Sequence, residues 1–325
     1  MLKYYDRPIT GTGLTLRDDS QPISDRTVWI DLVNPTVEED KALEAALGIS
    51  IPTRAEMREI ESSSRLYSEN GTSYMTAFIV YDIEAAIPKS STVTFILAGQ
   101  RVVTVRYAEP KAFPMYLARA DKGISPCYSG ASVMMGLIET LISRKADLIE
   151  RIQDEVEALT HQLFDIKGGQ QSRNRRLDVV LKATGKQGDK VASAQEAAMS
   201  MERLLNYFQQ TLRQHNGDDQ VLSRIEAARH DIASLNDHMR FLSDRTSFLL
   251  SATLGMITTE QNQIIKLFSV MAVILMPPTL VASIYGMNFR HMPELGWELG
   301  YPTAIGLMFL SALIPFVYFK RKGWL

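Results

Sequence analysis

Two long uncharged runs dominate the pattern of apolar and polar positions. Residues 267–289 and residues 301–319 contain no Asp, Glu, Lys or Arg over 23 and 19 positions. The hydrocarbon core of a bilayer is about 30 Å thick and takes about 20 helical residues, so each run has the length of a spanning helix. We predict a first transmembrane helix over 267–289, an external loop over 290–300 and a second transmembrane helix over 301–319.

The charges that flank these runs favour a membrane hairpin over two core helices of a soluble domain. Lys266 precedes the first run and a basic tail over 320–325 follows the second, whereas the loop holds one Arg and two Glu. Positive residues concentrate on the cytoplasmic side of membrane proteins, which predicts that both termini are cytoplasmic. The first five residues lack the apolar stretch of a signal peptide, in agreement with this orientation.

Proline spacing separates a mixed N-terminal part from a helical part. Eight of the 13 prolines lie at or before Pro126, and the next one is Pro277. Proline interrupts helix interiors, so the 150 residues between these two prolines are predicted to be mostly helical. We place an α/β domain over residues 1–126 and a helical hairpin over residues 127–217.

Local signals support strands and hairpins in the N-terminal part. An apolar, β-branched run over 27–32 predicts a strand. Thr36 and Glu39 have the spacing of a capping box at the start of a helix. Asn70-Gly71 and residues 98–100 each separate two alternating runs, which predicts two hairpins.

A further helical segment continues towards the membrane without a stop signal. It is predicted as a stalk helix over 218–266 that runs directly into the first span. In the helix before it, Gly185 and Gly188 are candidate interruptions. The apolar positions of the stalk step by four and three residues, as in a coiled-coil seam, and they are Val221, Ile225, Ala228, Ile232, Leu235, Met239 and Leu242. Packing of this seam within one subunit and packing between subunits are both compatible with the pattern.

Composition excludes several classes of protein. With 35 Lys+Arg and 37 Asp+Glu the net charge is −2, which argues against a general nucleic-acid binder. Residues 261–325 carry five cations and two carboxylates, a net +3, so residues 1–260 carry −5. The single cysteine excludes an internal disulfide, and the five histidines show no zinc-ligand spacing with it. No P-loop or nucleophile motif is present, so no enzymatic activity is predicted.

Carboxylates cluster on one predicted helix and leave two interpretations open. The clustered side chains are Asp147, Glu150, Asp154, Glu155 and Glu157. They suit the solvated face of a long helix, and they also suit divalent-cation sensing between subunits, because hard cations prefer carboxylate oxygens.

The first span carries a stripe of residues on one helical face. The stripe is polar at both ends and apolar in its middle, and it consists of Asn262, Ile265, Phe268, Ala272, Met276, Thr279 and Ser283. One alternative is that this stripe packs against the second span. A transport pathway would require a ring of identical subunits, because two helices in one chain cannot enclose a pore.

Several motifs near the C-terminus carry a resemblance to a known family. They are EQNQIIK (260–266), MPPTLVAS (276–283), YGMNF (285–289), MPEL (292–295) and the ending YFKRKGWL (318–325). On these motifs the chain resembles the CorA family of magnesium transporters, whose signature is the Gly-Met-Asn triplet followed by Met-Pro-Glu-Leu. The close match covers about the last 65 residues, and the rest agrees in layout.

The resemblance implies an architecture and an assembly. The expected fold is an α+β cytoplasmic domain with a long helical stalk and a C-terminal two-helix transmembrane hairpin. The expected assembly is a funnel-shaped homopentamer in the cell inner (plasma) membrane, in contact with lipid, with the first membrane helices lining the pore and the second ones outside. No nucleic acid is expected as a partner.

The resemblance also implies a function and site residues. The expected function is a channel that carries Mg²⁺ into the cytoplasm down the electrochemical gradient, with Co²⁺ and Ni²⁺ as further candidate ions. Mg²⁺ is expected as both substrate and regulatory ligand, with no other cofactor; intracellular Mg²⁺ would close the pore through carboxylates not assigned to positions. Gly286, Met287 and Asn288 would form the selectivity filter, and Glu294 would gather cations at the external mouth. Lys320, Arg321 and Lys322 would form a cytoplasmic basic ring.

Chemistry gives these residues distinct expected tasks. Mg²⁺ loses its waters reluctantly and is best selected through its hydration shell by neutral oxygens, which Asn288 offers. Gly286 is expected to permit a backbone turn that a side chain would obstruct, through a positive φ if the turn needs one. Arg290 places a positive charge beside the triplet, which opposes electrostatic attraction of Mg²⁺ by the external loop. A Zn²⁺ transporter of the same fold and a non-transporting, membrane-anchored sensor or scaffold remain as alternatives.

Overall fold

The computed structural model describes most of the chain. The described residues are 1–8, 12–17, 23–59, 61–85, 87–165, 170–215, 217–288 and 292–324, without the side chains of 62, 170–174, 294 and 295. By contacts the chain divides into two compact units, which are described separately: Met1–Asp165 with Lys182–Leu250, and Ile166–Leu181 with Ser251–Leu325. The segment boundaries predicted at residues 126, 217 and 266 stay predictions.

The first unit contains one seven-stranded sheet. The strands are β1 (Leu2–Asp6), β2 (Thr15–Arg17), β3 (Thr27–Val33), β4 (Leu66–Glu69), β5 (Thr72–Tyr81), β6 (Lys89–Ala98) and β7 (Arg101–Arg106), in the order β2-β1-β3-β7-β6-β5-β4. β3 and β7 pair in parallel, and the other neighbours pair antiparallel. The two predicted hairpins are confirmed as β4–β5 and β6–β7, and the predicted strand over 27–32 is confirmed as β3.

Short helices connect and cover the sheet. They are α1 (Val37–Leu47), the 3₁₀ turn η1 (Glu56–Arg58), α2 (Ser62–Arg65) and α3 (Ala112–Asp121). The predicted capping box at α1 is confirmed: the Glu39 amide donates to Thr36 Oγ1 at 3.3 Å and the Thr36 amide donates to Glu39 Oε2 at 2.9 Å. This pair satisfies two backbone N–H groups that the first turn of a helix leaves without partners.

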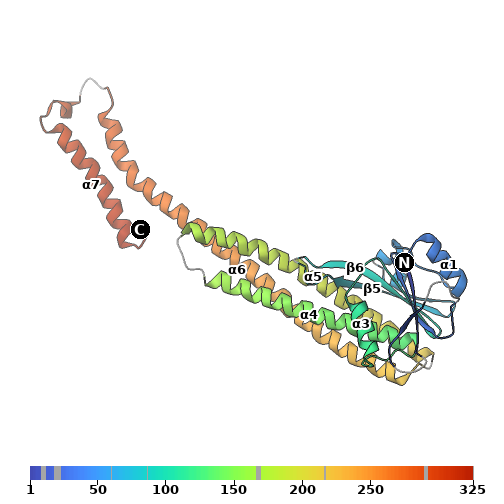
Figure 1. Cartoon of the computed structure of the whole chain (residues 1–325). Helices are drawn as coiled ribbons and strands as arrows, with labels where there is room; N and C mark the ends of the chain where they lie inside the picture. The colour runs from blue at the N-terminus through green and yellow to red at the C-terminus, as the bar shows by residue number, and fades with distance from the viewer. Residues whose placement is uncertain are drawn as a thin grey trace. The chain divides into compact units, whose positions relative to one another are not determined.

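Three long helices pack, with their parts in the first unit, on one side of the sheet (Figure 1). They are α4 (Gly130–Phe164), α5 (Gln170–Gln214) and α6 (Asp219–Tyr285). Their apolar faces join the sheet in one core around Trp29, Phe95, Leu137 and Phe208, and α1 and η1 cover the opposite face around Ile30 and Val103. The alternation of Trp29 and Ile30 between the two cores follows from the two-residue period of a strand.

The long helices correct one expectation and decide another. α5 runs through Gly185 and Gly188, so these glycines do not interrupt it; a glycine inside a helix costs only about 1 kcal/mol, which packing along 45 residues outweighs.

The seam of α6 packs inside the chain, because Val221, Ile225 and Ile232 belong to the core formed with the sheet and α4. The seam is therefore an intrachain contact at these heights.

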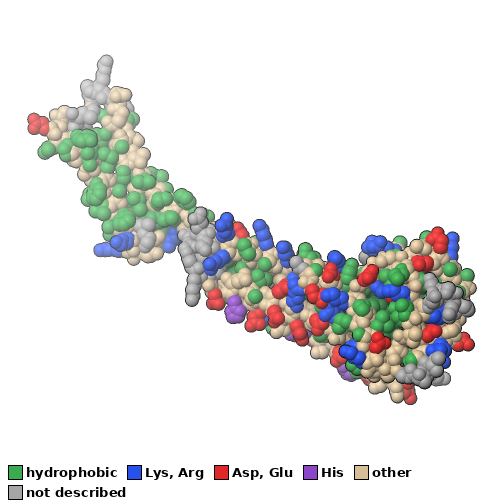
Figure 2. Space-filling model, viewed as in Figure 1, with side chains coloured by type: hydrophobic (Ala, Val, Ile, Leu, Met, Phe, Trp, Pro, Cys, Tyr) green, Lys and Arg blue, Asp and Glu red, His purple; other side chains and the backbone are tan. Residues whose placement is uncertain are grey.

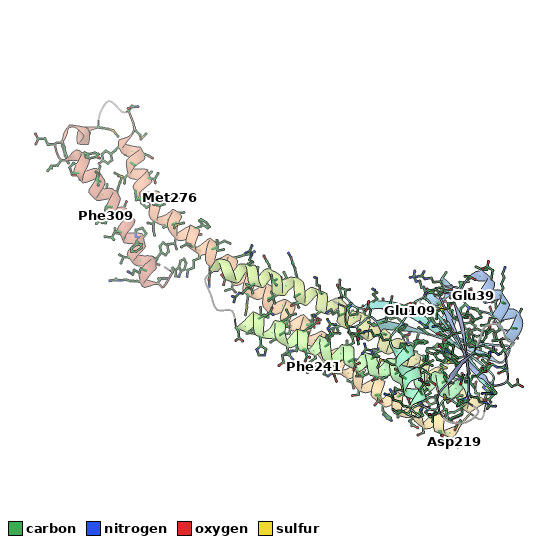
Figure 3. All side chains as sticks on the ribbon, viewed as in Figure 1. Glu39, Glu109, Asp219, Phe241, Met276 and Phe309 are labelled. Carbon is green, nitrogen blue, oxygen red and sulfur yellow. The ribbon has the colours of Figure 1, made fainter. Side chains whose placement is uncertain are left out.

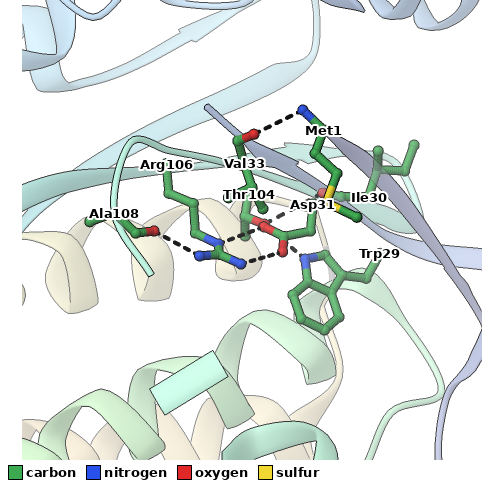
Figure 4. A network of polar contacts seen from close by, with 8 residues as sticks. All are labelled: Met1, Trp29, Ile30, Asp31, Val33, Thr104, Arg106 and Ala108. Carbon is green, nitrogen blue, oxygen red and sulfur yellow. Dashed lines mark hydrogen bonds and ion pairs between the residues drawn. The ribbon is translucent and has the colours of Figure 1, made fainter. Parts of the chain in front are cut away.

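A buried polar network lies at the parallel pair of strands (Figure 4). Arg106 donates from Nε and Nη2 to the two carboxylate oxygens of Asp31 at 3.0 and 2.8 Å, and from Nη1 to the carbonyl of Ala108 at 2.7 Å. Thr104 donates to Asp31 Oδ1 at 2.8 Å and accepts from Trp29 Nε1 at 2.9 Å. Each charge in this buried network therefore has hydrogen-bonded partners, which makes its desolvation tolerable.

The second unit holds the C-terminal hairpin. It comprises the C-terminal part of α6, the 3₁₀ turn η2 (Pro293–Gly296) and α7 (Gly300–Arg321). α6 and α7 are long and apolar enough to cross a membrane, and only 6% of the most hydrophobic window of each is buried within the chain. Apolar surface of this extent is stable only against lipid or partner helices.

Candidate functional site: the ion pathway

The predicted stripe lies on one face of α6, which is exposed on most of its sides over residues 261–288. All seven of its residues are helical and exposed, with Ile265, Phe268 and Met276 at 61%, 63% and 68%. Figure 3 labels Met276 on this helix and Phe309 on α7. Val270, which is only 1% exposed, lies about 160° around the helix from Phe268 and Ala272. The alternative that the stripe packs against the second span is therefore not what the structure shows. The side of α6 that is buried is the one that carries Val270.

Two hydroxyl groups on the stripe have their protons committed to the backbone. Thr279 Oγ1 donates to the carbonyl of Leu275 at 2.7 Å, and Ser283 Oγ donates to the carbonyl of Thr279 at 2.8 Å. A hydroxyl that has donated its proton keeps its lone pairs as acceptors. A hydrated cation presents water hydrogens outward, so these two oxygens can accept hydrogen bonds from the waters around a hydrated Mg²⁺.

Two adjacent prolines lie inside the same segment. Pro277 and Pro278 are within α6, directly after Met276. The helix continues through them to Tyr285, and neither residue supplies a backbone N–H.

The Gly-Met-Asn triplet follows the last turn of α6. The Gly286 amide donates to the carbonyl of Ala282 at 3.0 Å and the Met287 amide to that of Ile284 at 3.2 Å, and the chain then leaves the helix with Met287 and Asn288 exposed. The expectation of a positive φ at Gly286 is wrong, because Gly286 is not among the described glycines with that conformation. A Cβ at this position would lie 3.2 Å from the Ala282 carbonyl oxygen, so close backbone approach is the constraint.

The external loop is only partly described. Arg290 and the side chain of Glu294 lie outside the described part, so the expected gathering of cations by Glu294 and the expected effect of Arg290 remain predictions. The loop residues that are described include η2 and Trp297, whose side chain is 64% exposed.

Basic residues gather at the opposite end of the hairpin. Lys320 and Arg321 lie in the last turn of α7 and Lys322 caps it, and all three are exposed. Figure 2 shows Lys and Arg side chains at this end of the hairpin. Cations are favourable at a helix C-terminus because of the helix dipole. The role of these residues as a ring stays a prediction.

The acidic cluster of α4 forms no metal site within one chain. In the described residues, no group of three or more His, Cys, Asp or Glu side chains is placed to hold a metal ion. Glu155 is engaged instead by Arg151, Lys190 and Gln187. Burial acts to raise the pKa of Glu155, but the hydrogen bonds from Lys190 and Gln187 outweigh it and hold that pKa below its ordinary value. No local sequence pattern indicates this structural use of Glu155.

Comparisons with known proteins agree with the geometry. The family profile described as "CorA-like Mg2+ transporter protein" matches residues 24–321. The chain is 37% identical over 311 residues to a magnesium transport protein CorA of Yersinia pestis, with 95% of each chain covered. It is 36% identical over 308 residues to that of Escherichia coli K12, again with 95% of each covered.

A solved structure shows the same fold over the whole chain. The complete structure of the CorA magnesium transporter from Methanocaldococcus jannaschii superposes with a TM-score of 0.78 at 18% identity, covering 100% of this chain and 99% of that one. The sequence match, the exposed stripe and the triplet after α6 lead to one conclusion: the chain belongs to the CorA-like Mg²⁺ transporter family.

Proposed function

We propose that the chain is the subunit of a homopentameric channel that carries Mg²⁺ into the cytoplasm, with α6 lining the pore. As a member of a transporter family it is not an enzyme. The observation that carries the proposal is the stripe on α6, which is exposed along its length, polar at both ends and apolar in the middle. In a ring of identical subunits this face meets the central axis while α7 lies outside.

The described oxygens support a hydrated substrate. Asn288 offers a neutral oxygen where the backbone leaves the helix, and Thr279 and Ser283 offer acceptor oxygens below it. The apolar residues Met276, Phe268 and Ile265 provide constrictions that close by dewetting. A divalent ion that crosses 100 mV inward gains about 4.6 kcal/mol, so inward flow needs no nucleotide.

The basic flanks support the orientation. Lys266 contacts Trp324 next to the cations after α7, which supports an inner (plasma) membrane protein with both termini cytoplasmic. The net charge of −5 over residues 1–260 supports closure by intracellular Mg²⁺, because subunits in a ring repel one another until a divalent ion binds between them. Mg²⁺ is then both cargo and regulator.

Ion uptake by proteoliposomes tests the substrate. The purified full chain is reconstituted with an inside-negative potential, and influx of Mg²⁺, Co²⁺, Ni²⁺ and Zn²⁺ is compared. We expect Mg²⁺ influx, slower when the face that bears the cytoplasmic body meets millimolar Mg²⁺. Zn²⁺ influx without Mg²⁺ influx would show that the substrate is Zn²⁺ and not Mg²⁺. Absence of influx for every ion would favour the scaffold alternative.

Cysteine accessibility tests the pathway itself. Ser283→Cys places a nearly isosteric thiol on the stripe, and Ile284→Cys is the matched control, at the same depth but about 100° around the helix. Both are made with Cys127→Ser, since Cys127 is the only native cysteine. An external, membrane-impermeant thiol reagent should block Mg²⁺ influx through the Ser283→Cys variant and not through the Ile284→Cys variant. Equal sensitivity of the two variants would place the pathway elsewhere.

A further inference from the structure

Helix α7 ends in a hydrogen-bonded turn over Lys322, Gly323 and Trp324. After α7 the Gly323 amide donates to the carbonyl of Lys320 at 3.2 Å, and the Trp324 amide donates to that of Phe319 at 3.0 Å. Gly323 has φ +68°, the left-handed conformation that this double hydrogen-bond pattern requires. The pattern is a Schellman motif, and it reverses the chain so that Trp324 returns to the side of α7.

The returned Trp324 makes two ring contacts. Its ring stacks on Phe319 with centroids 5.5 Å apart and planes 22° apart, which is the apolar contact expected for this capping motif. The ammonium nitrogen of Lys266 lies 4.9 Å from the centroid of Trp324. This distance is within the range of a cation–π interaction, for which Trp is the strongest aromatic partner. The last turn of the second span is thereby connected to α6.

Lys266 is a cation that lies next to the stripe on α6. It is the only Lys or Arg of this helix after Arg245, and it directly follows Ile265 of the stripe. Successive helical residues are about 100° apart, so Lys266 borders the stripe and does not belong to it. A lysine side chain is long and flexible, and a free ammonium here could reach the face along which a divalent cation would pass.

We propose that Trp324 is a positioning residue for ion conduction: it holds the Lys266 ammonium on the α7 side of α6 and so keeps a repelling charge out of the pathway. The consequence for conduction rests on the proposed function. The contact itself rests only on the geometry of the hairpin. Lys320, Arg321 and Lys322 surround the same end but belong to the end of α7, so they cannot replace Lys266 on α6.

Amine labelling tests the contact without reference to transport. The full chain in proteoliposomes is treated with a water-soluble amine-acylating reagent, and labelling of Lys266 is read by mass spectrometry against exposed Lys41. Trp324→Ala should raise labelling of Lys266 about two- to five-fold, the factor that an exposed cation–π contact corresponds to, and Trp324→Phe should raise it less. Unchanged labelling in Trp324→Ala would overturn the contact.

The capping turn provides matched variants. An added Cβ at Gly323 meets nothing within 4 Å, so Gly323→Ala acts only through the positive φ. It should raise labelling as Trp324→Ala does, and Gly323→Asn should raise it less, because Asn tolerates that conformation. Labelling at the wild-type level in Gly323→Ala would contradict a role for the turn.

A double-variant experiment tests the consequence for conduction. Trp324→Ala should lower Mg²⁺ influx by a factor of similar size, Lys266→Met should conduct like the wild type, and the double variant should recover because no free cation remains. Loss of influx that Lys266→Met does not restore would assign Trp324 a merely structural role and overturn the proposal. If the wild type itself carries no Mg²⁺, the proposed function fails, whereas the labelling result still decides the contact.

Discussion

Arg106 and Asp31 form a bidentate ion pair across the only parallel strand pair in the described sheet, with both side chains almost completely buried. Paired in this way, the two charges satisfy each other in a place that water does not reach. Removal of one partner leaves the other as an uncompensated buried charge.

Asp31→Ala should therefore destabilise the cytoplasmic body by about 3–5 kcal/mol. Thermal unfolding of the purified full chain, followed by circular dichroism, measures this loss. The matched control is Asp31→Leu with Arg106→Met, which removes both charges and should recover most of the stability. An Asp31→Ala variant as stable as the wild type would show that the pair contributes no net stability.

Lys145 makes the stability of the body depend on pH. Its side chain lines a pocket with Leu141, Ile142 and Met201 among other apolar residues, and burial lowers the pKa of Lys145 to about 7. The folded state then binds fewer protons than the unfolded state between pH 7 and the ordinary lysine pKa, so this group makes stability rise with pH across that window.

Lys145→Met should remove that dependence. It should stabilise the protein at pH 7 by on the order of 1 kcal/mol, the cost of a buried polar group without a partner. The gain should shrink as pH rises from 7 towards the ordinary lysine pKa of 10.5, above which the wild-type lysine is neutral in both states. Melting temperatures of both proteins at pH 7 and pH 10 check the prediction, which fails if the difference is the same at both values.

Two exposed phenylalanines on α6 should contribute to the ring. Phe241 and Phe248 are 55% and 60% exposed within one chain and lie seven residues apart, hence on one face of the helix. Replacing both by Ser should weaken subunit association without unfolding the body. Native mass of the detergent-solubilised protein measures the oligomer, and Met199→Ser, at an exposed apolar position on α5, is the control. An intact oligomer in the double variant would contradict the prediction.

Gly286→Ala should lower Mg²⁺ influx by about ten-fold or more while leaving the oligomer intact. The reason is the short approach of a Cβ to the Ala282 carbonyl, which forces the backbone before Met287 to shift. A misplacement of about 1 Å at a functional site can cost about 100-fold in rate, and the shift required here is a few tenths of an ångström, so we expect the smaller factor of about ten. Influx in proteoliposomes and native mass are measured together, and wild-type influx would show that the triplet is not positioned by this contact.

Asn288→Asp should raise the affinity for divalent cations at the Gly-Met-Asn triplet and lower the rate of transport. The substitution keeps the size of the side chain and adds a charge, so it should bind divalent cations more tightly, slow their release and reduce discrimination between Mg²⁺ and Co²⁺. Competition of Co²⁺ with Mg²⁺ influx provides the measurement. Unaltered competition and an unaltered rate would place the selective contact at another residue.

Local signals were sufficient for part of the structure. The capping box at Thr36, the turn at Asn70-Gly71 and the two uncharged runs each depend on neighbours in the sequence, and the structure contains all three features. The stripe from Asn262 to Ser283 followed from helical period alone. Its residues are helical and exposed, and their role in lining a pore stays a prediction.

Other features depend on distant residues and could not be predicted. The parallel pairing of β3 with β7 joins segments about 70 residues apart, and no local pattern specifies it. The lowered pKa of Lys145 arises from burial to which β5, α5 and α6 contribute apolar side chains besides those of its own helix α4. The conformation of Gly286 was predicted wrongly because close backbone approach, which sequence does not reveal, replaces a positive φ as the reason for glycine.

The adjacent prolines give α6 a preferred place to bend. Without N–H groups at Pro277 and Pro278, the carbonyls of Val273 and Ile274 have no donor one turn ahead, so two consecutive rungs of the helix are absent. A bend at Pro277 and Pro278 breaks no further backbone hydrogen bond, whereas a bend elsewhere in the 67-residue helix does. The last two turns, which carry Thr279 and Ser283 up to the triplet, can therefore tilt as a unit relative to the turn that precedes Pro277.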